Sequence, residues 1–293
     1  MRIVVTGRDG QVARSLAERS EGRGHELVFL ARPELDLADP AGVGPAIAAA
    51  RPDLVVNAAA YTAVDKAESE PELAMRINGD GAGAVARAAA AAGVPVIQLS
   101  TDYVFDGGLP NPYRETDLTD PLGAYGRSKW QGEQAVRAAG APWLILRTAW
   151  VYSPFGANFV RTMLRLAGDR DELGVVADQQ GCPTSALDIA DAILTLADRW
   201  AAGDRSGWDD VYHLVGTGDT SWAGLARAIF AASAEQGGPS ARVRDIATSD
   251  YPTPARRPAN SRLHTGKLHG AFGIELPAWQ QSLRPVVTRL LGG

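Results

Sequence analysis

The chain of 293 residues lacks several features that would place it in other classes of protein. Its one cysteine, Cys182, cannot form an internal disulfide, so we expect a protein of a reducing compartment such as the cytoplasm. The histidines also lack the spacing of metal ligands, whether with the cysteine or with one another, and they stand at His25, His213, His264 and His269. We therefore expect no catalytic metal.

Charge and hydropathy exclude further classes. The net charge is −5 and no polybasic run occurs, which argues against a nucleic-acid partner or an anionic membrane partner. The alanine-rich stretch 82–92 contains Arg87 and is far shorter than the roughly 20 apolar residues of a membrane span. The apolar run at the N-terminus is too short for a signal peptide and leads directly into a glycine-rich turn.

What the sequence does contain is an alternation of apolar strands and helical segments. Strands are predicted near residues 3–6, 26–30, 54–57, 94–99 and 143–146. This order indicates an α/β fold of the Rossmann-like type, with a doubly wound parallel sheet, helices on both faces and ligands at the carboxyl ends of the strands.

Beyond Val151 the alternation becomes irregular. Helices are predicted over 158–168, 185–200, 221–236 and 278–291, and strands over 174–177 and 211–215. We expect a dinucleotide-binding Rossmann domain over 1–150, joined by returning segments of the C-terminal half. Residues 151–293 are expected to form mainly a smaller α/β substrate-binding lobe.

The glycine-rich turn follows the first strand and precedes a helix that begins near Gln11. Such a turn directs backbone N–H groups and the positive end of the helix towards a pyrophosphate. The spacing is Gly-x-x-Gly-x-x-Ala, and many glycine-rich turns are only tight connections. The expected dinucleotide contacts here are Gly7, Asp9, Gly10, Gln11 and Val12.

The end of the second strand is where dinucleotide enzymes distinguish a free ribose hydroxyl from a 2′-phosphate. No carboxylate stands there, Arg32 follows the strand, and Arg8 lies in the glycine-rich turn. We therefore predict a preference for NADPH, with NADH possible, although Arg32 could equally be a solvated loop residue. Asp36 and Leu37 are expected on the adenine side, and Asp39 before Pro40 is a good helix N-cap.

The third strand ends in small residues that let a flat ligand approach the backbone. The cofactor contacts expected in this place are Ala58, Ala59, Ala60 and Tyr61. The segment 61–78 alternates acids and bases, so most of it is predicted to be a solvated helix face whose charges need no functional role.

Tyr125 and Lys129 are the candidate acid–base pair, because residues four apart on a helix share a face. A free phenol has a pKa of about 10 and is a poor acid–base group near neutral pH. The Lys129 ammonium is expected to lower the pKa of Tyr125 and bring it closer to the useful range. Thr101, at the end of the fourth strand, offers a hydroxyl for the substrate oxygen. The same spacing also occurs on exposed helices, where a tyrosine packs along a lysine stem.

Motifs in both halves carry a family resemblance. They are Gly-x-x-Gly-Gln at the start, Val-Asn-Ala-Ala-Ala-Tyr-Thr-Ala-Val-Asp-Lys-Ala-Glu at 56–68, Ser-Thr-Asp-Tyr-Val-Phe-Asp-Gly at 100–107, Tyr-x-x-x-Lys at 125–129, Arg-Thr-Ala-Trp-Val-Tyr at 147–152, Asp-Gln-Gln-Gly at 178–181 and the segment 251–261. Along nearly its full length the chain resembles the dTDP-4-dehydrorhamnose reductase family of extended short-chain dehydrogenases/reductases.

The resemblance implies transfer of a hydride from the nicotinamide to the C4 ketone of dTDP-4-dehydro-L-rhamnose, which gives dTDP-L-rhamnose. Tyr125 would protonate the alkoxide, Lys129 would lower the Tyr125 pKa and hold the nicotinamide ribose, and Thr101 would orient the C4 oxygen. The implied substrate contacts are Thr101, Asp102, Tyr103, Tyr125, Trp150, Asn158, Arg257 and Asn260. Arg257 is a candidate diphosphate clamp, for which Arg256 and Arg262 compete. Trp150 could also be plain core.

Two other functions remain open at this point. A nucleotide-sugar 4-epimerase or 4,6-dehydratase shares the fold and Tyr-x-x-x-Lys, but a dehydratase needs an acid where Tyr103 stands. A non-catalytic regulatory subunit, similar to the methionine adenosyltransferase beta subunit, has the same fold. Family members that form a magnesium-linked dimer use a glutamate where Ser15 stands, so a monomer or a weak homodimer is expected.

Overall fold

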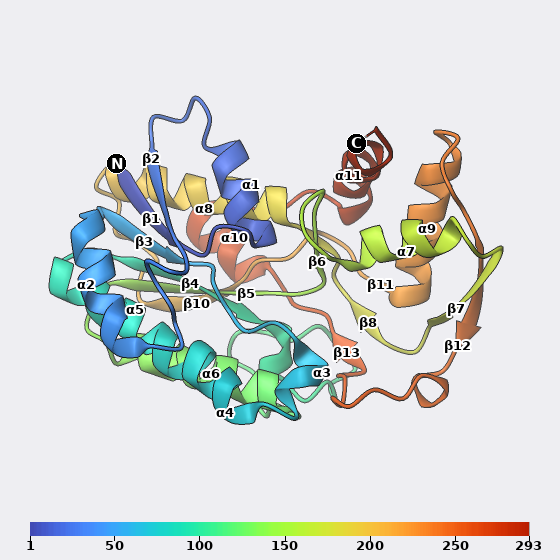
Figure 1. Ribbon diagram of the computed structural model, residues 1–293, viewed down its shortest axis with the longest axis horizontal. Helices are drawn as coiled ribbons and strands as arrows, with labels where there is room; N and C mark the ends of the chain where they lie inside the picture. The colour runs from blue at the N-terminus through green and yellow to red at the C-terminus, as the bar shows by residue number, and fades with distance from the viewer. Residues whose placement is uncertain (293) are drawn as a thin grey trace.

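The computed structural model describes residues 1–292, and a six-stranded parallel sheet forms its centre (Figure 1). The strands of this sheet are β1 (Arg2–Thr6), β2 (Glu26–Leu30), β3 (Leu54–Asn57), β4 (Val96–Thr101), β5 (Trp143–Thr148) and β10 (Asp210–His213). Their order is β10-β5-β4-β3-β1-β2. Because β1 pairs with β2 on one side and β3 on the other, the strand order reverses beside β1. The carboxyl ends of strands at such a reversal form the crevice where ligands bind in this class of fold.

The fourth strand begins and ends two residues later than 94–99, the range that the sequence predicts. The Val94 N–H donates to the Ala89 carbonyl at the end of the preceding helix, over 3.0 Å. Pro95 has no N–H to donate. The ladder therefore starts at Val96, and the strand continues far enough to place Thr101 at its last position.

Helices cover both faces of the sheet, which confirms the predicted fold class (Figure 1). One face carries α1 (Gln11–Arg19), α8 (Ala186–Ala201) and α10 (Gly266–Phe272), and the other carries α2 (Pro40–Ala50), α5 (Ala82–Ala92) and α6 (Ala124–Arg137). Successive strand residues point to opposite faces, so Val56 joins the first core and Val55 the second. Asp39 occupies the N-cap position of α2 as predicted, but its side chain makes no capping hydrogen bond.

The prediction that most of 61–78 is a solvated helix face is correct for exposure, but the helix is not continuous. The segment divides into α3 (Val64–Ala67), α4 (Pro71–Met75) and a π-helical turn, η1 (Arg76–Gly81), that leads into α5. A new helix starts at Pro71 because the residue before a proline is disfavoured in helical conformation. Asn78 is buried, and its amide bonds both the backbone N–H and the carbonyl of Tyr61, over 2.8 and 3.0 Å.

The C-terminal half builds a second lobe with a core of its own, at the right of Figure 1. It contains α7 (Phe159–Ala167), α9 (Trp222–Ala234), α11 (Trp279–Gly292) and a parallel pair formed by β7 (Glu172–Val176) and β12 (Arg242–Ile246). Shorter pairings join β6 (Val151–Tyr152) to β9 (Thr184–Ser185), and β8 (Gln180–Gly181) to β11 (Thr220–Ser221) and β13 (Asn260–Ser261). The sequence predicts neither β12 nor α10.

Three elements of the C-terminal half return to the large sheet. β10 extends it by pairing with β5, α10 lies against β10, and α8 packs against α1. Two 3-10 turns, η2 (Asp102–Val104) and η3 (Thr248–Asp250), complete the described structure. Among residues 1–292, no helix is both long enough and apolar enough to cross a membrane.

Candidate active site

The glycine-rich turn has the geometry of an anion cradle. Gly7 has a φ of +84°, and a Cβ added to it would lie 3.4 Å from the Ala59 Cβ. Gly10 is the N-cap of α1 in extended conformation and offers no side chain to bond the first-turn N–H groups. Free N–H groups at the start of a helix favour phosphate oxygens. The residues present therefore fit the pyrophosphate of a dinucleotide. The Val12 side chain belongs to the core, so only its backbone is open to such a ligand.

Two arginines stand beside the end of β2. The Arg8 guanidinium donates to the Phe29 carbonyl over 3.5 Å and lies 3.7 Å from the Glu34 carboxylate. Arg32 is exposed. Asp36 accepts a hydrogen bond from the Ala38 N–H over 2.9 Å, and Leu37 is buried beside it. The Arg8 and Arg32 guanidinium groups are the candidate donors to a phosphate at this corner, where the carboxylates of Glu34 and Asp36 also lie.

A chain of buried polar groups fixes the carboxyl ends of the central strands. The Thr6 hydroxyl donates to the Asn57 amide oxygen over 2.5 Å and accepts from the Ala59 N–H over 3.1 Å. The Asn57 amide donates to Gln98 on β4 over 2.7 Å. Ala58, Ala59 and Ala60 are therefore held as a half-buried loop at the mouth of the crevice, next to Gly7.

Thr101, Tyr125 and Lys129 come from β4 and the first turns of α6. The Thr101 hydroxyl donates to Asp102 over 2.9 Å and accepts from the Tyr103 N–H over 3.2 Å. Tyr125 packs edge-on against the Tyr103 ring, with 5.5 Å between the ring centroids. The Lys129 ammonium is buried and donates to the Leu99 carbonyl over 2.7 Å.

The expected lowering of the Tyr125 pKa by Lys129 is wrong for this arrangement. Burial raises the pKa of Tyr125 well above 10, and the nearby Thr101 hydroxyl opposes this only partly. Lys129 directs its ammonium to the Leu99 carbonyl, and burial lowers its own pKa to about 8. A phenol with a raised pKa stays protonated near neutral pH. Tyr125 is thus in the state required of a proton donor.

Asp102 is a buried carboxyl beside this pair. It is 3% exposed, and burial raises its pKa to about 6, against hydrogen bonds from Ser261 and Thr101 that lower it. Its Oδ2 atom has no hydrogen-bond partner within residues 1–292. A buried polar atom without a partner is uncommon in folded proteins.

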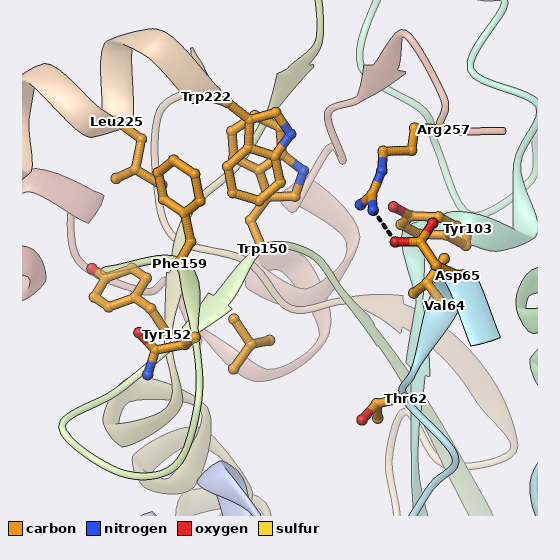
Figure 2. A pocket seen from close by; sticks show the side chains of 12 residues that line it. Thr62, Val64, Asp65, Tyr103, Trp150, Tyr152, Phe159, Trp222, Leu225 and Arg257 are labelled. Atoms are coloured by element: carbon orange, nitrogen blue, oxygen red, sulfur yellow. Dashed lines mark hydrogen bonds and ion pairs between the residues drawn. The ribbon is translucent and has the colours of Figure 1, made fainter. Parts of the chain in front are cut away.

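A cavity of about 450 Å³ lies between the two lobes (Figure 2). One wall is aromatic and consists of Trp150, Tyr152, Phe159 and Trp222. The opposite wall is more polar and includes Thr62, Asp65, Tyr103 and Arg257. Planar apolar groups on one side and charged groups on the other are the features of a site for a small molecule with a ring and a charged portion.

Trp150 has a strained backbone and a closely packed ring. Its φ is +48°, which is rare for a bulky residue. Its indole stacks on Trp222, with 3.6 Å between the centroids and 9° between the planes. On Gly181 an added Cβ would lie 2.3 Å from the Trp150 ring, so only glycine fits there. Strain of this kind persists where the surroundings enforce it, and it clusters at binding sites.

Arg257 lies in the cavity wall but is already paired. Its guanidinium donates to the Asp65 carboxylate over 2.8 Å (Figure 2). The Ala255 N–H donates to the same carboxylate over 3.3 Å. Asp65 thus holds the segment around Arg257 against the first lobe. This ion pair is a structural contact, so the prediction that the charges of 61–78 need no functional role stays a prediction.

Asn158 and Asn260 differ in their positions. Asn158 lines the cavity and caps α7 by accepting from the Arg161 N–H over 3.1 Å. Its amide also donates to Gln11, which joins the cavity wall to the glycine-rich turn. Asn260 does not line the cavity, and its amide donates to the carbonyls of 109 and 111 over 2.7 and 2.8 Å. These two hydrogen bonds of Asn260 fix the loop around residues 109–111.

Sequence reasoning missed Trp222, Asp65, Glu133 and Arg147 as residues of the site and its support. Trp222 and Asp65 line the cavity, whereas Glu133 and Arg147 form a buried ion pair of 2.7 Å beneath α6. Of these four, only Glu133 could have been predicted from the sequence, because it lies four residues after Lys129 on the same helix face.

The parallel sheet, the glycine-rich turn before α1 and the Tyr-x-x-x-Lys helix define an oxidoreductase of the short-chain dehydrogenase/reductase type. Residues 1–291 match the family described as the RmlD substrate binding domain. The chain is 53% identical to the dTDP-4-dehydrorhamnose reductase of Sinorhizobium fredii, with 99% of this chain and 98% of the relative aligned. It therefore belongs to the dTDP-4-dehydrorhamnose reductase family.

Solved structures agree with this assignment. The dTDP-4-dehydrorhamnose reductase of Clostridium acetobutylicum superposes with a TM-score of 0.92 at 36% identity and covers 99% of both chains. The dTDP-4-dehydrorhamnose reductase of Bacillus anthracis, solved in complex with NADP, has a TM-score of 0.88 at 33% identity and covers 98% of both chains.

Proposed function

We propose that this protein reduces the C4 ketone of dTDP-4-dehydro-L-rhamnose to the alcohol of dTDP-L-rhamnose, with NADPH as the reductant. The observation that carries the proposal is the position of Tyr125, protonated and next to Thr101 at the carboxyl end of β4. The names of the relatives and the NADP complex of the Bacillus anthracis reductase support the substrate and the cofactor.

The residues around the crevice suit the two halves of the reduction. NADPH, when bound, supplies the hydride that adds to the C4 carbon. The Thr101 hydroxyl orients the C4 oxygen, and Tyr125 donates its proton to that oxygen as negative charge develops on it. The tyrosinate then regains a proton from solvent. Lys129, a buried ammonium at this site that donates to the Leu99 carbonyl, would also hold the nicotinamide ribose.

Residues at the carboxyl ends of β1 and β3 would hold the rest of the cofactor. Backbone N–H groups of residues 8–12 would bind the pyrophosphate, Gly7 would allow its close approach while its own N–H donates to the Leu30 carbonyl, and Ala58 to Tyr61 would cover the dinucleotide. Arg8 and Arg32 favour NADPH over NADH through the 2′-phosphate, and Asp36 and Leu37 lie on the adenine side. In this proposal residues 1–150 form the dinucleotide domain, and most of 151–293 binds the sugar nucleotide.

The cavity holds the sugar nucleotide between its two walls. Trp150 and Trp222 offer flat apolar surface, whereas Arg257 can make bidentate hydrogen bonds to diphosphate oxygens. Arg257 must then exchange its bond to Asp65 for bonds to phosphate. Asp102 and Tyr103 face the sugar, and Asn158 shapes the wall beside it. For Asn260, the bonds to the 109–111 loop favour an indirect role.

The test is oxidation of NADPH with a panel of 4-keto nucleotide sugars that differ in base and sugar. We expect a net loss of NADPH absorbance that is fastest with dTDP-4-dehydro-L-rhamnose, and slower with NADH than with NADPH. An epimerase or a 4,6-dehydratase recycles its cofactor and consumes none. A regulatory subunit gives no turnover with any member of the panel, and either result would reject the proposal.

For the assembly, we propose a chain that does not form a magnesium-linked dimer. The Ser15 side chain is fully buried and donates to the Gln11 carbonyl of its own helix over 2.8 Å, so it is not a surface ligand for a divalent cation. Light scattering with and without a chelator should give the same mass. A dimer that dissociates on chelation would contradict this expectation.

A further inference from the structure

Beneath the catalytic face of α6 lies a buried charge cluster that the proposed reaction does not use directly. Glu133 and Arg147 have side-chain exposures of 0% and 2%, and two nearly parallel hydrogen bonds of 2.7 and 2.9 Å join them. The Ser100 hydroxyl donates to the Glu133 carboxylate over 2.6 Å. Burial of two charges is costly, and replacing such a pair with apolar residues is often neutral or stabilising. Stability alone therefore does not account for the pair.

The cluster is joined to Lys129 by helix and strand geometry. Tyr125, Lys129 and Glu133 follow one another at intervals of four on α6, so they share one face. The Lys129 ammonium bonds the Leu99 carbonyl, and Glu133 bonds the side chain of the next residue, Ser100. Both side chains therefore meet β4 at adjacent positions.

We propose that Glu133, held in place by Arg147 and Ser100, is a positioning residue that keeps Lys129 protonated and directed at the end of β4. A buried ammonium without a nearby negative charge tends to lose its proton. Burial lowers the pKa of Lys129 to about 8, and the Glu133 carboxylate is the group that opposes this fall. The role of Lys129 in turnover rests on the proposed function, whereas its protonation does not.

Within residues 1–292, Glu133 is the carboxylate whose charge raises the pKa of Lys129, and the other charged groups around α6 do not take this role. Several charged or titratable groups lie on the elements that pack against α6. Asp102 and Tyr103 directly follow β4, and Arg147 of β5 is bonded to Glu133. The others are exposed or half-buried: Asp65, Lys66, Glu72, Arg76, Asp80 and Arg87. Glu133 is therefore the buried carboxylate on the lysine's own helix face.

The chain is well suited to a direct test, because its only lysines are Lys66, Lys129 and Lys267. Protein labelled with ¹³C at the lysine Cε gives few resonances, which Lys66→Arg and Lys267→Arg variants assign. A pH titration of the free protein then follows Lys129 without substrate. In Glu133→Gln we expect the Lys129 midpoint to fall by about one pH unit, the usual effect of losing a close opposite charge.

Two further variants separate this effect from misfolding. Glu133→Gln leaves Arg147 without its counter-ion, so the double variant Glu133→Gln, Arg147→Met removes both charges and is expected to fold with the same lowered midpoint. Glu115→Gln removes another buried carboxylate, which accepts a hydrogen bond from the backbone N–H of His213 over 3.0 Å. This variant should leave the titration midpoint of Lys129 unchanged. An unchanged Lys129 midpoint in the folded double variant would overturn the proposal.

Kinetics provides an independent second readout. The alkaline limb of the pH profile for NADPH oxidation should move to lower pH in the double variant, by the same amount as the NMR midpoint. If the NMR midpoint of Lys129 falls but the alkaline limb of the pH profile does not move, the role of Glu133 stands and the assigned role of Lys129 in turnover is rejected. A purely structural role predicts neither shift.

Discussion

Two groups of buried polar side chains flank the carboxyl end of β4, and protein groups bond them to very different degrees. Ser100 points to the side where Glu133 and Arg147 bond it and each other. The next residue, Thr101, points to the opposite side, where Asp102 keeps an oxygen without a protein partner within residues 1–292. Protein groups bond both oxygens of the Glu133 carboxylate, whereas Thr101 bonds one oxygen of the Asp102 carboxylate and leaves the other free in the described structure. In the proposed function the second group lies on the ligand side.

The two groups also differ in their unpaired atoms. The Arg147 Nη1 atom has no hydrogen-bond partner within the described part of the chain, but its guanidinium lies 5.0 Å from the centre of the Phe105 ring. A cation over an aromatic face is stabilised by the ring electrons. The unpaired Asp102 oxygen is an acceptor and needs a hydrogen-bond donor instead. The proposed function places the chemistry on that side of β4.

The largest expected effect comes from the reacting side. Tyr125→Phe keeps the ring against Tyr103 and removes only the proton donor, so turnover should fall by about 10³-fold to 10⁴-fold. NADPH oxidation under saturating substrate measures the loss, and circular dichroism checks that the fold is retained. Turnover within tenfold of the wild type would remove Tyr125 from the reaction.

The next largest effect concerns the supporting side. Arg147→Met leaves the Glu133 charge buried without its partner and should lower the free energy of unfolding by about 3–5 kcal/mol. The double variant with Glu133→Gln should recover most of this loss, as measured by urea unfolding. Equal losses in the single and the double variant would show that the pair is not the source of the destabilisation.

Asp102→Asn should have a smaller effect that depends on pH. The folded-state pKa of Asp102 is about 6 and its ordinary value is 3.8, so the folded chain binds the extra proton between these values. The contribution of Asp102 to stability is therefore greatest at low pH and is lost as the pH rises through 6. Relative to the wild type, Asp102→Asn should gain about 2 kcal/mol between pH 4 and pH 7, at about 1.4 kcal/mol per pKa unit. Urea unfolding across that range would contradict this if the difference between the two proteins stayed constant.

The smallest expected effect lies in the aromatic wall of the cavity. Trp222→Leu removes the stacking partner of Trp150 and should raise KM for the sugar nucleotide by about tenfold. The KM for NADPH should stay unchanged, because Trp222 belongs to α9 in the second lobe. The matched control is Trp208→Leu, at an aromatic contact with Trp200 outside the cavity. Equal changes in both variants would argue against a role for Trp222 in binding.

The sequence was sufficient for features that depend on local pattern. Apolar strands, the Gly7 turn and the Tyr125–Lys129 spacing all follow from short-range rules, and the family motifs extended the interpretation to the second lobe. The strand β12 escaped notice because its residues are mostly exposed and carry alternating charges, as in Arg242 and Arg244. The predicted lowering of the Tyr125 pKa was wrong because burial, which a sequence does not show, raises this pKa, and Lys129 bonds the Leu99 carbonyl instead of the phenol.

Pairings between distant residues were beyond sequence reasoning. Asp65 and Arg257 are 192 positions apart, and nothing in either local pattern indicates that they form an ion pair. The stack of Trp150 on Trp222 likewise depends on how α9 lies against β6. Tertiary packing determines such contacts.

The proposed function depends most on the transfer of a hydride from the cofactor to the C4 carbon of the sugar. The direct measurement is turnover of dTDP-4-dehydro-L-rhamnose with NADPH deuterated at the transferring position of C4, followed by mass spectrometry and NMR of the product. We expect one deuterium per product molecule, located at C4 of the sugar, with one NADPH consumed. A product without deuterium, or turnover without net consumption of NADPH, would contradict the account.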